Sequence, residues 1–206
     1  MLFKLLVLCS FLIVLLQLRR LVNILPSLLA CLIRGKESLN LEASVKLSRD
    51  RDALALAMII PFCLATFRYR LYFPGFFEGL SDDAALGLTF AAFFAYLLLR
   101  IAVSALFRPQ KIQKKTYVAA SKASFSFFII YALLLLAMGA AFSLTDIFEA
   151  DARNAMLWVS AFIYMLFLIR KTQIFSTSCS VFIAFLYLCG LEMIPTGILV
   201  VSAIIF

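Results

Sequence analysis

Six long apolar runs alternate along the chain with shorter segments that carry most of the charged residues. A helix needs about 20 apolar residues to cross a bilayer, and most of the runs approach that length. We therefore predict an all-α, polytopic membrane protein with about six transmembrane helices in a single transmembrane domain, residues 1–206. The expected spans are residues 2–18, 53–73, 85–107, 125–142, 155–169 and 181–203.

The first run also has some features of a signal peptide, because Lys4 precedes a leucine-rich stretch. Signal peptides end in a small-residue cleavage site, and no such site follows this run. We therefore expect residues 2–18 to form an uncleaved first span.

Residues 21–33 are apolar but are divided by Pro26, and each half is too short to cross a membrane. Their basic borders are typical of a helix that lies in the cytoplasmic interface. Alternatively, these residues extend the cytoplasmic ends of the neighbouring spans. The sequence pattern favours neither interpretation.

The composition agrees with a membrane location, since 65% of the residues are apolar and only 15% are charged. Soluble domains are typically about 45–50% apolar and about 25% charged. The net charge of +8 would also suit a nucleic-acid-binding protein. The charges are confined to segments between apolar runs, however, so we expect the lipid bilayer and not a nucleic acid to be the partner.

The distribution of the basic residues predicts a topology. Three segments, residues 19–52, 108–122 and 170–180, contain most of the basic residues. Together with Arg100, which we assign to the second segment, they hold 15 of the 19 Lys and Arg residues. Cytoplasmic loops carry an excess of Lys and Arg, so these three segments are expected inside and both termini outside.

Few residues of this chain offer catalytic or metal-binding chemistry. There is no histidine, and the five cysteines form no C-x-x-C pair. We also find no Gly-rich phosphate cradle, no paired acids at metal spacing and no nucleophile with an adjacent base. We therefore predict no enzymatic activity, no cofactor and no metal site.

Glu192 is the most unusual residue, because it lies near the middle of the last expected span. A charged side chain at that depth costs about 2.5–3.5 kcal/mol and is usually kept for a partner or a function. Pro195 should kink the helix beside it. Gly190 and Gly197 would allow another backbone to approach closely.

Arg100, in the third expected span, is the candidate partner of Glu192, although its side chain could instead extend to the basic loop. Tyr187 is the nearest of several tyrosines inside spans whose hydroxyls could join the same site or bond to backbone carbonyls. Two roles are then open for Glu192. It is either a structural anchor, in which a neutral carboxyl group is hydrogen-bonded to a partner helix, or it is a proton or ion site. The candidate intramembrane polar site comprises Glu192, Arg100, Pro195 and Tyr187.

Five basic residues in the predicted inner loops could contact anionic lipid headgroups or the acidic face of another protein. They could equally form ordinary positively charged loops. These residues are Arg19, Arg20, Lys111, Lys114 and Lys115.

The motif Phe185-Leu-Tyr-Leu-Cys-Gly-Leu-Glu192-Met-Ile-Pro195 resembles the C-terminal motif of an uncharacterised multi-pass inner-membrane family of Bacteroidota, a domain of unknown function. The order of a first span, a basic segment up to Arg51 and further spans is also similar. This resemblance implies location in the cell inner (cytoplasmic) membrane of a Gram-negative bacterium, so the outer side on which the charge distribution places the termini is expected to be the periplasm. It implies no particular activity.

We therefore expect a non-enzymatic structural or accessory subunit of a membrane complex, with other membrane-protein subunits or a second copy of itself as partners. The alternative is a small transporter or proton-coupled conduit that uses Glu192. The expected spans offer few further polar residues to line a pathway.

Overall fold

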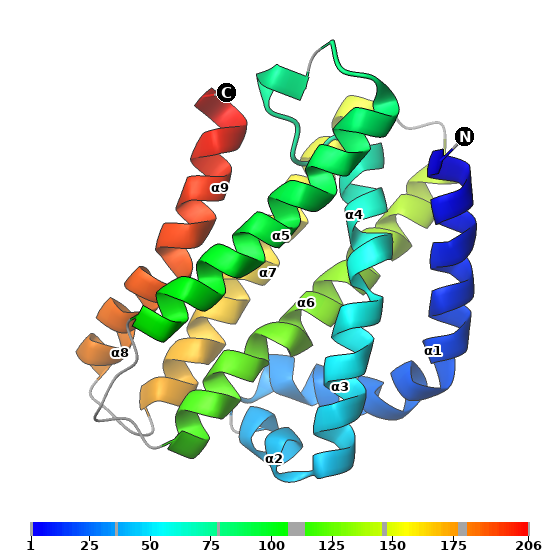
Figure 1. Ribbon diagram of the computed structural model, residues 1–206. Coiled ribbons are helices and arrows are strands. Elements are labelled where there is room, and N and C mark those ends of the chain that lie inside the picture. The colour runs from blue at the N-terminus through cyan, green and yellow to red at the C-terminus, as the bar shows by residue number, and fades with distance from the viewer. Residues whose placement is uncertain are drawn as a thin grey trace.

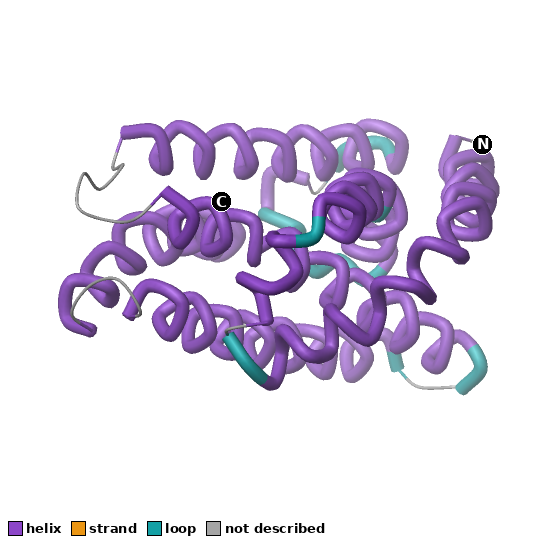
Figure 2. The backbone as a smooth tube through the Cα atoms, turned by 90° about the horizontal axis from the view of Figure 1, so that it is seen from below, coloured by secondary structure: helices purple, strands orange, loops and turns teal. Residues whose placement is uncertain are grey.

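The computed structural model describes residues 2–35, 37–77, 79–106, 114–145, 148–176 and 181–205. In these ranges the regular structure is entirely helical, with short turns between the elements (Figure 2). The α-helices are α1 (Leu2–Ile33), α2 (Glu37–Ala43), α3 (Val45–Ala57), α4 (Ile59–Arg68), α5 (Asp82–Leu106), α6 (Lys114–Ser143), α7 (Glu149–Ser176), α8 (Val181–Leu188) and α9 (Ile194–Ile205). Two short elements complete them: the 3₁₀-helix η1 (Gly75–Phe77) and the π-helix η2 (Cys189–Met193).

The helices run alternately up and down the molecule (Figure 1). In that view α1, α5 and α7 run downward, whereas α3 with α4, α6, and α8 with α9 run upward. The N- and C-termini consequently lie at the same end, and the short helix α2 lies at the opposite end.

Five helical segments of the described chain are long and apolar enough to cross a membrane. An α-helix satisfies all of its backbone hydrogen bonds internally, which is the condition for crossing hydrocarbon. The fold is therefore that of an all-helical, multi-pass membrane protein. The five segments are Phe3–Ile33, Asp82–Ser104, Thr116–Ser143, Glu149–Ser176 and Ala184–Ala203.

The expected second span, residues 53–73, differs most from the structure. It is formed by α3 and α4, which follow one another with only Met58 between them, and the helix ends at Arg68 and not at residue 73. Arg70 has a φ of 47°, which is incompatible with a continuing right-handed helix. Neither α3 nor α4 alone has the length of a spanning helix.

The other helices extend beyond the expected spans. The first helix continues past residue 18, α6 begins before residue 125, and α7 includes residues on both sides of 155–169. Most of the predicted basic segment 19–52 is therefore helical. The apolar runs mark only the lipid-soluble part of each helix, whereas Arg, Lys, Glu and Ala at the ends are good helix formers.

Residues 21–33 do not form a separate helix but the end of α1, which continues through Pro26. This end turns beneath the other helices, close to α2 and α3 (Figure 1). Ile24, Leu28 and Cys31 are buried there at helical spacing, in the same core cluster as residues of α3 and α6. These residues belong to the packed core of the protein.

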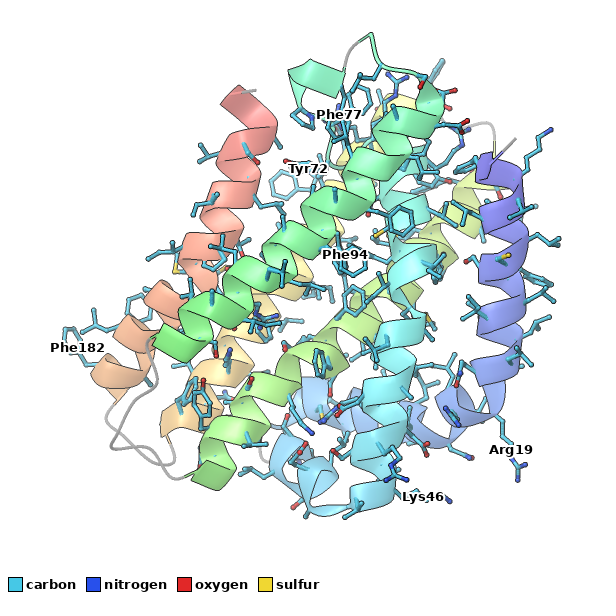
Figure 3. All side chains as sticks on the ribbon, in the orientation of Figure 1. Arg19, Lys46, Tyr72, Phe77, Phe94 and Phe182 are labelled. Atoms are coloured by element: carbon cyan, nitrogen blue, oxygen red, sulfur yellow. The ribbon has the colours of Figure 1, made fainter. Side chains whose placement is uncertain are left out.

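A second group of contacts joins α4, α5 and α6 through the aromatic ring of Phe62. The ring centroid of Phe62 lies 5.3 Å from that of Phe93 and 5.1 Å from that of Phe128. Aromatic pairs at this separation add to the free energy gained from burial of their surface. The loop after α4 is joined to α9 by Tyr72, whose hydroxyl lies 3.0 Å from that of Ser202 (Figure 3).

The outer faces of the helices are strongly apolar. On α7, four large side chains at spacings of three and four residues are between 48% and 78% exposed: Trp158, Phe162, Met165 and Ile169. Such a stripe suits contact with lipid tails, because water would strongly disfavour so large an exposed apolar face.

Candidate functional site

Three helices bring charged side chains together around Glu192. The carboxylate oxygen Oε1 of Glu192 accepts a hydrogen bond of 2.6 Å from Arg100 on α5 and another from Lys171 on α7. Only 3% of the Glu192 side chain and 4% of the Lys171 side chain are exposed, compared with 21% for Arg100. We call these three residues the triad.

The positions of the triad cations follow from the helix repeat. On α7, Tyr164, Phe167 and Lys171 lie at spacings of three and four residues and therefore share one face. The Phe167 ring centroid is 5.7 Å from the Arg100 guanidinium carbon and 5.4 Å from Lys171 Nζ. The π-electrons of this ring stabilise both cations.

The backbone around Glu192 is a π-helical turn. The N–H of Ile194 donates to the carbonyl of Cys189, five residues earlier, whereas an α-helix would connect residues four apart. Pro195, which is buried, follows directly and has no N–H to donate. The distortion expected from Pro195 is accordingly present as a widened turn that contains Glu192.

The expected close approach at the two flanking glycines is wrong for the described part of the chain. A Cβ atom added to Gly190 or Gly197 would meet no atom of the protein within 4 Å.

The tyrosines inside the helices contact different partners. The hydroxyl of Tyr164 donates to the backbone carbonyl of Glu192 at 3.1 Å, and that of Tyr96 lies 3.4 Å from Thr196. Tyr131 bonds instead to Ser160, at 2.6 Å. The side chain of Tyr187 lies outside the described part of the structure.

Lys171 was missed by the sequence reasoning, which placed it in the basic segment after the fifth span. It is buried because α7 continues to Ser176. Helix periodicity carried the relevant signal, since Ile163, Phe167, Lys171 and Phe175 follow at intervals of four residues. Apolar residues on both sides of a lysine at this spacing indicate that it lies on the buried face.

The two cations of the triad lie near the ends of their helices. A helix rises 1.5 Å per residue, so Arg100 lies about 9 Å from the end of α5 at Leu106. Lys171 lies about 8 Å from the end of α7 at Ser176. Counting along the last helix alone predicted a position near mid-depth for Glu192. In the apolar segment Ala184–Ala203, Glu192 is the ninth of 20 residues, in agreement with that count.

Of the five basic residues predicted to contact lipid or a partner, the structure describes the side chains of Arg19 and Arg20. Arg19 and Arg20 are exposed on α1, and Arg19 points away from the bundle (Figure 3). Lys111 lies outside the described residues. Lys114 and Lys115 begin α6, but their side chains lie outside the described part of the structure.

A second charge cluster, also missed from the sequence, joins α2, α3 and α6. Arg51 is 1% exposed and pairs with Glu42 at 2.9 Å and Asp52 at 2.7 Å. Lys122 of α6 reaches the same two carboxylates, at 3.2 Å and 3.1 Å respectively. The cluster contains two cations and two anions and is therefore electrically balanced.

Among the residues that the structure describes, no group of three or more His, Cys, Asp or Glu side chains could hold a metal ion. Comparison of the chain with protein-family models, with curated proteins and with solved structures gave no match. The fold and the triad therefore place the protein in a broad class. It is an α-helical multi-pass membrane protein with an ion-paired polar site between its helices.

Proposed function

We propose that this protein is a non-enzymatic structural or accessory subunit of a membrane complex, in which the Glu192 triad is a structural anchor. The supporting observation is that Glu192 binds two cations from two different helices. The oxygen that accepts these two bonds is already occupied by side chains of the protein itself, so it is less available to a transported ion.

The anchor fixes the last helix against α5 and α7. Among the described residues, the other polar contacts of this helix are single hydrogen bonds between neutral groups, from Tyr164 to the Glu192 carbonyl, between Tyr96 and Thr196, and between Tyr72 and Ser202. The triad supplies the only ion pairs of this helix within the described part of the chain. Removal of one member of a buried ion pair is strongly destabilising, because the other charge is left unpaired. The triad therefore gives the last helix a defined position on which a partner could assemble.

The location that we propose is the cell inner membrane, with six crossings and both termini on the periplasmic side. Three observations support it: the basic segments follow every second expected span, α3 with α4 runs along the bundle in the direction opposite to α1 and α5, and both termini lie at one end of the bundle (Figure 1). The resemblance of the tail motif to the Bacteroidota family is in keeping with this proposal.

A small transporter or proton-coupled conduit is the second candidate. The π-helical turn at Glu192 favours it, since such turns are frequent at functional sites and leave backbone groups available to an ion. The hydroxyls of Tyr96, Tyr164 and Thr196 lie near the triad and would contribute polar groups to a pathway.

Gentle purification of the wild-type protein beside Glu192→Gln distinguishes the two functions. The matched control is Glu149→Gln, which removes an exposed carboxylate that pairs with Arg68 at 2.8 Å. A subunit should copurify with a stoichiometric partner that Glu192→Gln loses and Glu149→Gln keeps. An unchanged complex with a loss of pH-dependent flux in Glu192→Gln would support the conduit. Wild-type protein that purifies without any partner would contradict the subunit.

A further inference from the structure

The triad has one positive charge more than it can balance. Arg100 and Lys171 are cations, and both use the same oxygen of Glu192. No other acidic side chain among the described residues pairs with either of them. Burial of a net charge between helices is costly, so such sites are normally completed by a counter-ion.

The unbalanced charge is accessible at Arg100. Its side chain is 21% exposed, whereas that of Lys171 is almost fully enclosed. Of the five N–H donors of the guanidinium, one bonds to Glu192 in the described structure. The remaining donors form a fork that matches the oxygens of a phosphate group.

The position of Arg100 along α5 suits a lipid headgroup. It lies about 9 Å from the end of α5, slightly deeper than a headgroup zone about 5–8 Å thick, and a phosphate at the inner edge of that zone is within reach of its long side chain. Leu98 and Ile101, which are 68% and 65% exposed, lie on the outer face of the same part of α5 and offer an apolar surface for an acyl chain beside the face that carries Arg100. Basic pockets between helices near the membrane surface are known to hold anionic headgroups.

We propose that the phosphate group of an anionic phospholipid binds at Arg100 and balances the charge of the triad. This site is distinct from the exposed basic residues of the inner loops, because its charge lies between three helices. The proposal requires that the chain is in a membrane but does not require a partner subunit.

Native mass spectrometry of the delipidated full chain in detergent tests this site. The probes are phosphatidylglycerol, phosphatidylcholine with the same acyl chains, and inorganic phosphate. The wild type should bind one phosphatidylglycerol in preference to phosphatidylcholine. Each cation removed, in Arg100→Gln or Lys171→Met, should reduce that preference about fivefold. Arg19→Gln, which changes an exposed arginine, should leave it unaltered.

Glu192→Gln separates lipid binding from a purely structural effect. It makes the site more positive, so the preference for phosphatidylglycerol should increase even though the thermal stability falls. A fall in both the preference for phosphatidylglycerol and the thermal stability would overturn the proposal. A loss of this preference in Arg19→Gln as large as that in Arg100→Gln would also overturn it. If inorganic phosphate displaced phosphatidylglycerol at a concentration similar to that of the lipid, the ligand would be free phosphate and the proposal of a lipid would be wrong. A wild type without preference would mean that the charge is balanced elsewhere, for example by an acidic side chain of another subunit.

Discussion

The ammonium group of Lys171 and the carboxylate of Glu192 form an ion pair in which neither side chain is more than 4% exposed. The pair joins α7 to the π-helical turn of the last helix. Arg100 extends the contact to α5, so one carboxylate oxygen connects three helices that are distant in sequence. The stability of the protein should therefore depend strongly on Glu192.

The Arg51 cluster should be a second determinant of stability. Arg51→Met leaves Glu42 and Asp52 with only the partly exposed Lys122 as a partner. We expect a loss of about 3–5 kcal/mol in the free energy of unfolding, the usual cost of breaking a buried ion pair. Equilibrium unfolding in detergent, followed by circular dichroism, measures this loss.

The control for Arg51→Met is Arg49→Met, because Arg49 lies in the same helix but is exposed. Substitution of an exposed residue typically changes stability by less than about 0.5 kcal/mol. Equal effects of the two substitutions would show that the cluster does not hold α2, α3 and α6 together.

The contact between Tyr69 and Gly139 predicts a size limit on α6. The Tyr69 hydroxyl donates to the Gly139 carbonyl at 2.9 Å, and a Cβ atom on Gly139 would lie 3.2 Å from the tyrosine ring. Gly139→Val should destabilise the protein by about 1–3 kcal/mol, the range for overpacking. Gly87→Val, at a position where an added Cβ meets nothing within 4 Å, is the control in a thermal-denaturation assay.

The proposed topology predicts the location of fused reporters. Alkaline phosphatase, which is active only outside the cytoplasm, should be active when fused after residue 206 and inactive when fused in the segment 108–113. Green fluorescent protein should give the opposite result. Cytoplasmic behaviour of the fusion after residue 206 would contradict an even number of crossings with outer termini.

The helical class and the approximate positions of the helices could be predicted because apolar runs of this length have few other structural solutions. Helix ends were harder, since propensity allows a helix to continue into polar residues such as those after Ile169. The break at Met58 does have a signal in the sequence, which the span prediction did not use: Pro61 has no N–H to donate to the carbonyl of Ala57, four residues earlier.

The candidate site was only partly accessible from the sequence. Glu192 and Arg100 stand out because charged residues are rare in apolar runs. Lys171 and Arg51 lie where basic loops were expected, so their burial depends on how the helices pack. Helix periodicity gives a clue for Lys171, whereas the partners of Arg51 are set by tertiary contacts that no local pattern encodes.

The most direct test of the anchor is a double-mutant cycle between Lys171→Met and Glu192→Gln, with the free energy of unfolding in detergent as the readout. Glu192→Gln alone should cost about 3–5 kcal/mol, because the buried Lys171 and the partly buried Arg100 both lose their partner. The double variant should be more stable than Glu192→Gln, since one of those cations is also removed. The exposed pair Arg68–Glu149 provides the control and should show a coupling below about 1 kcal/mol. Losses at Lys171 and Glu192 that simply add would contradict the triad as the structural anchor of the last helix.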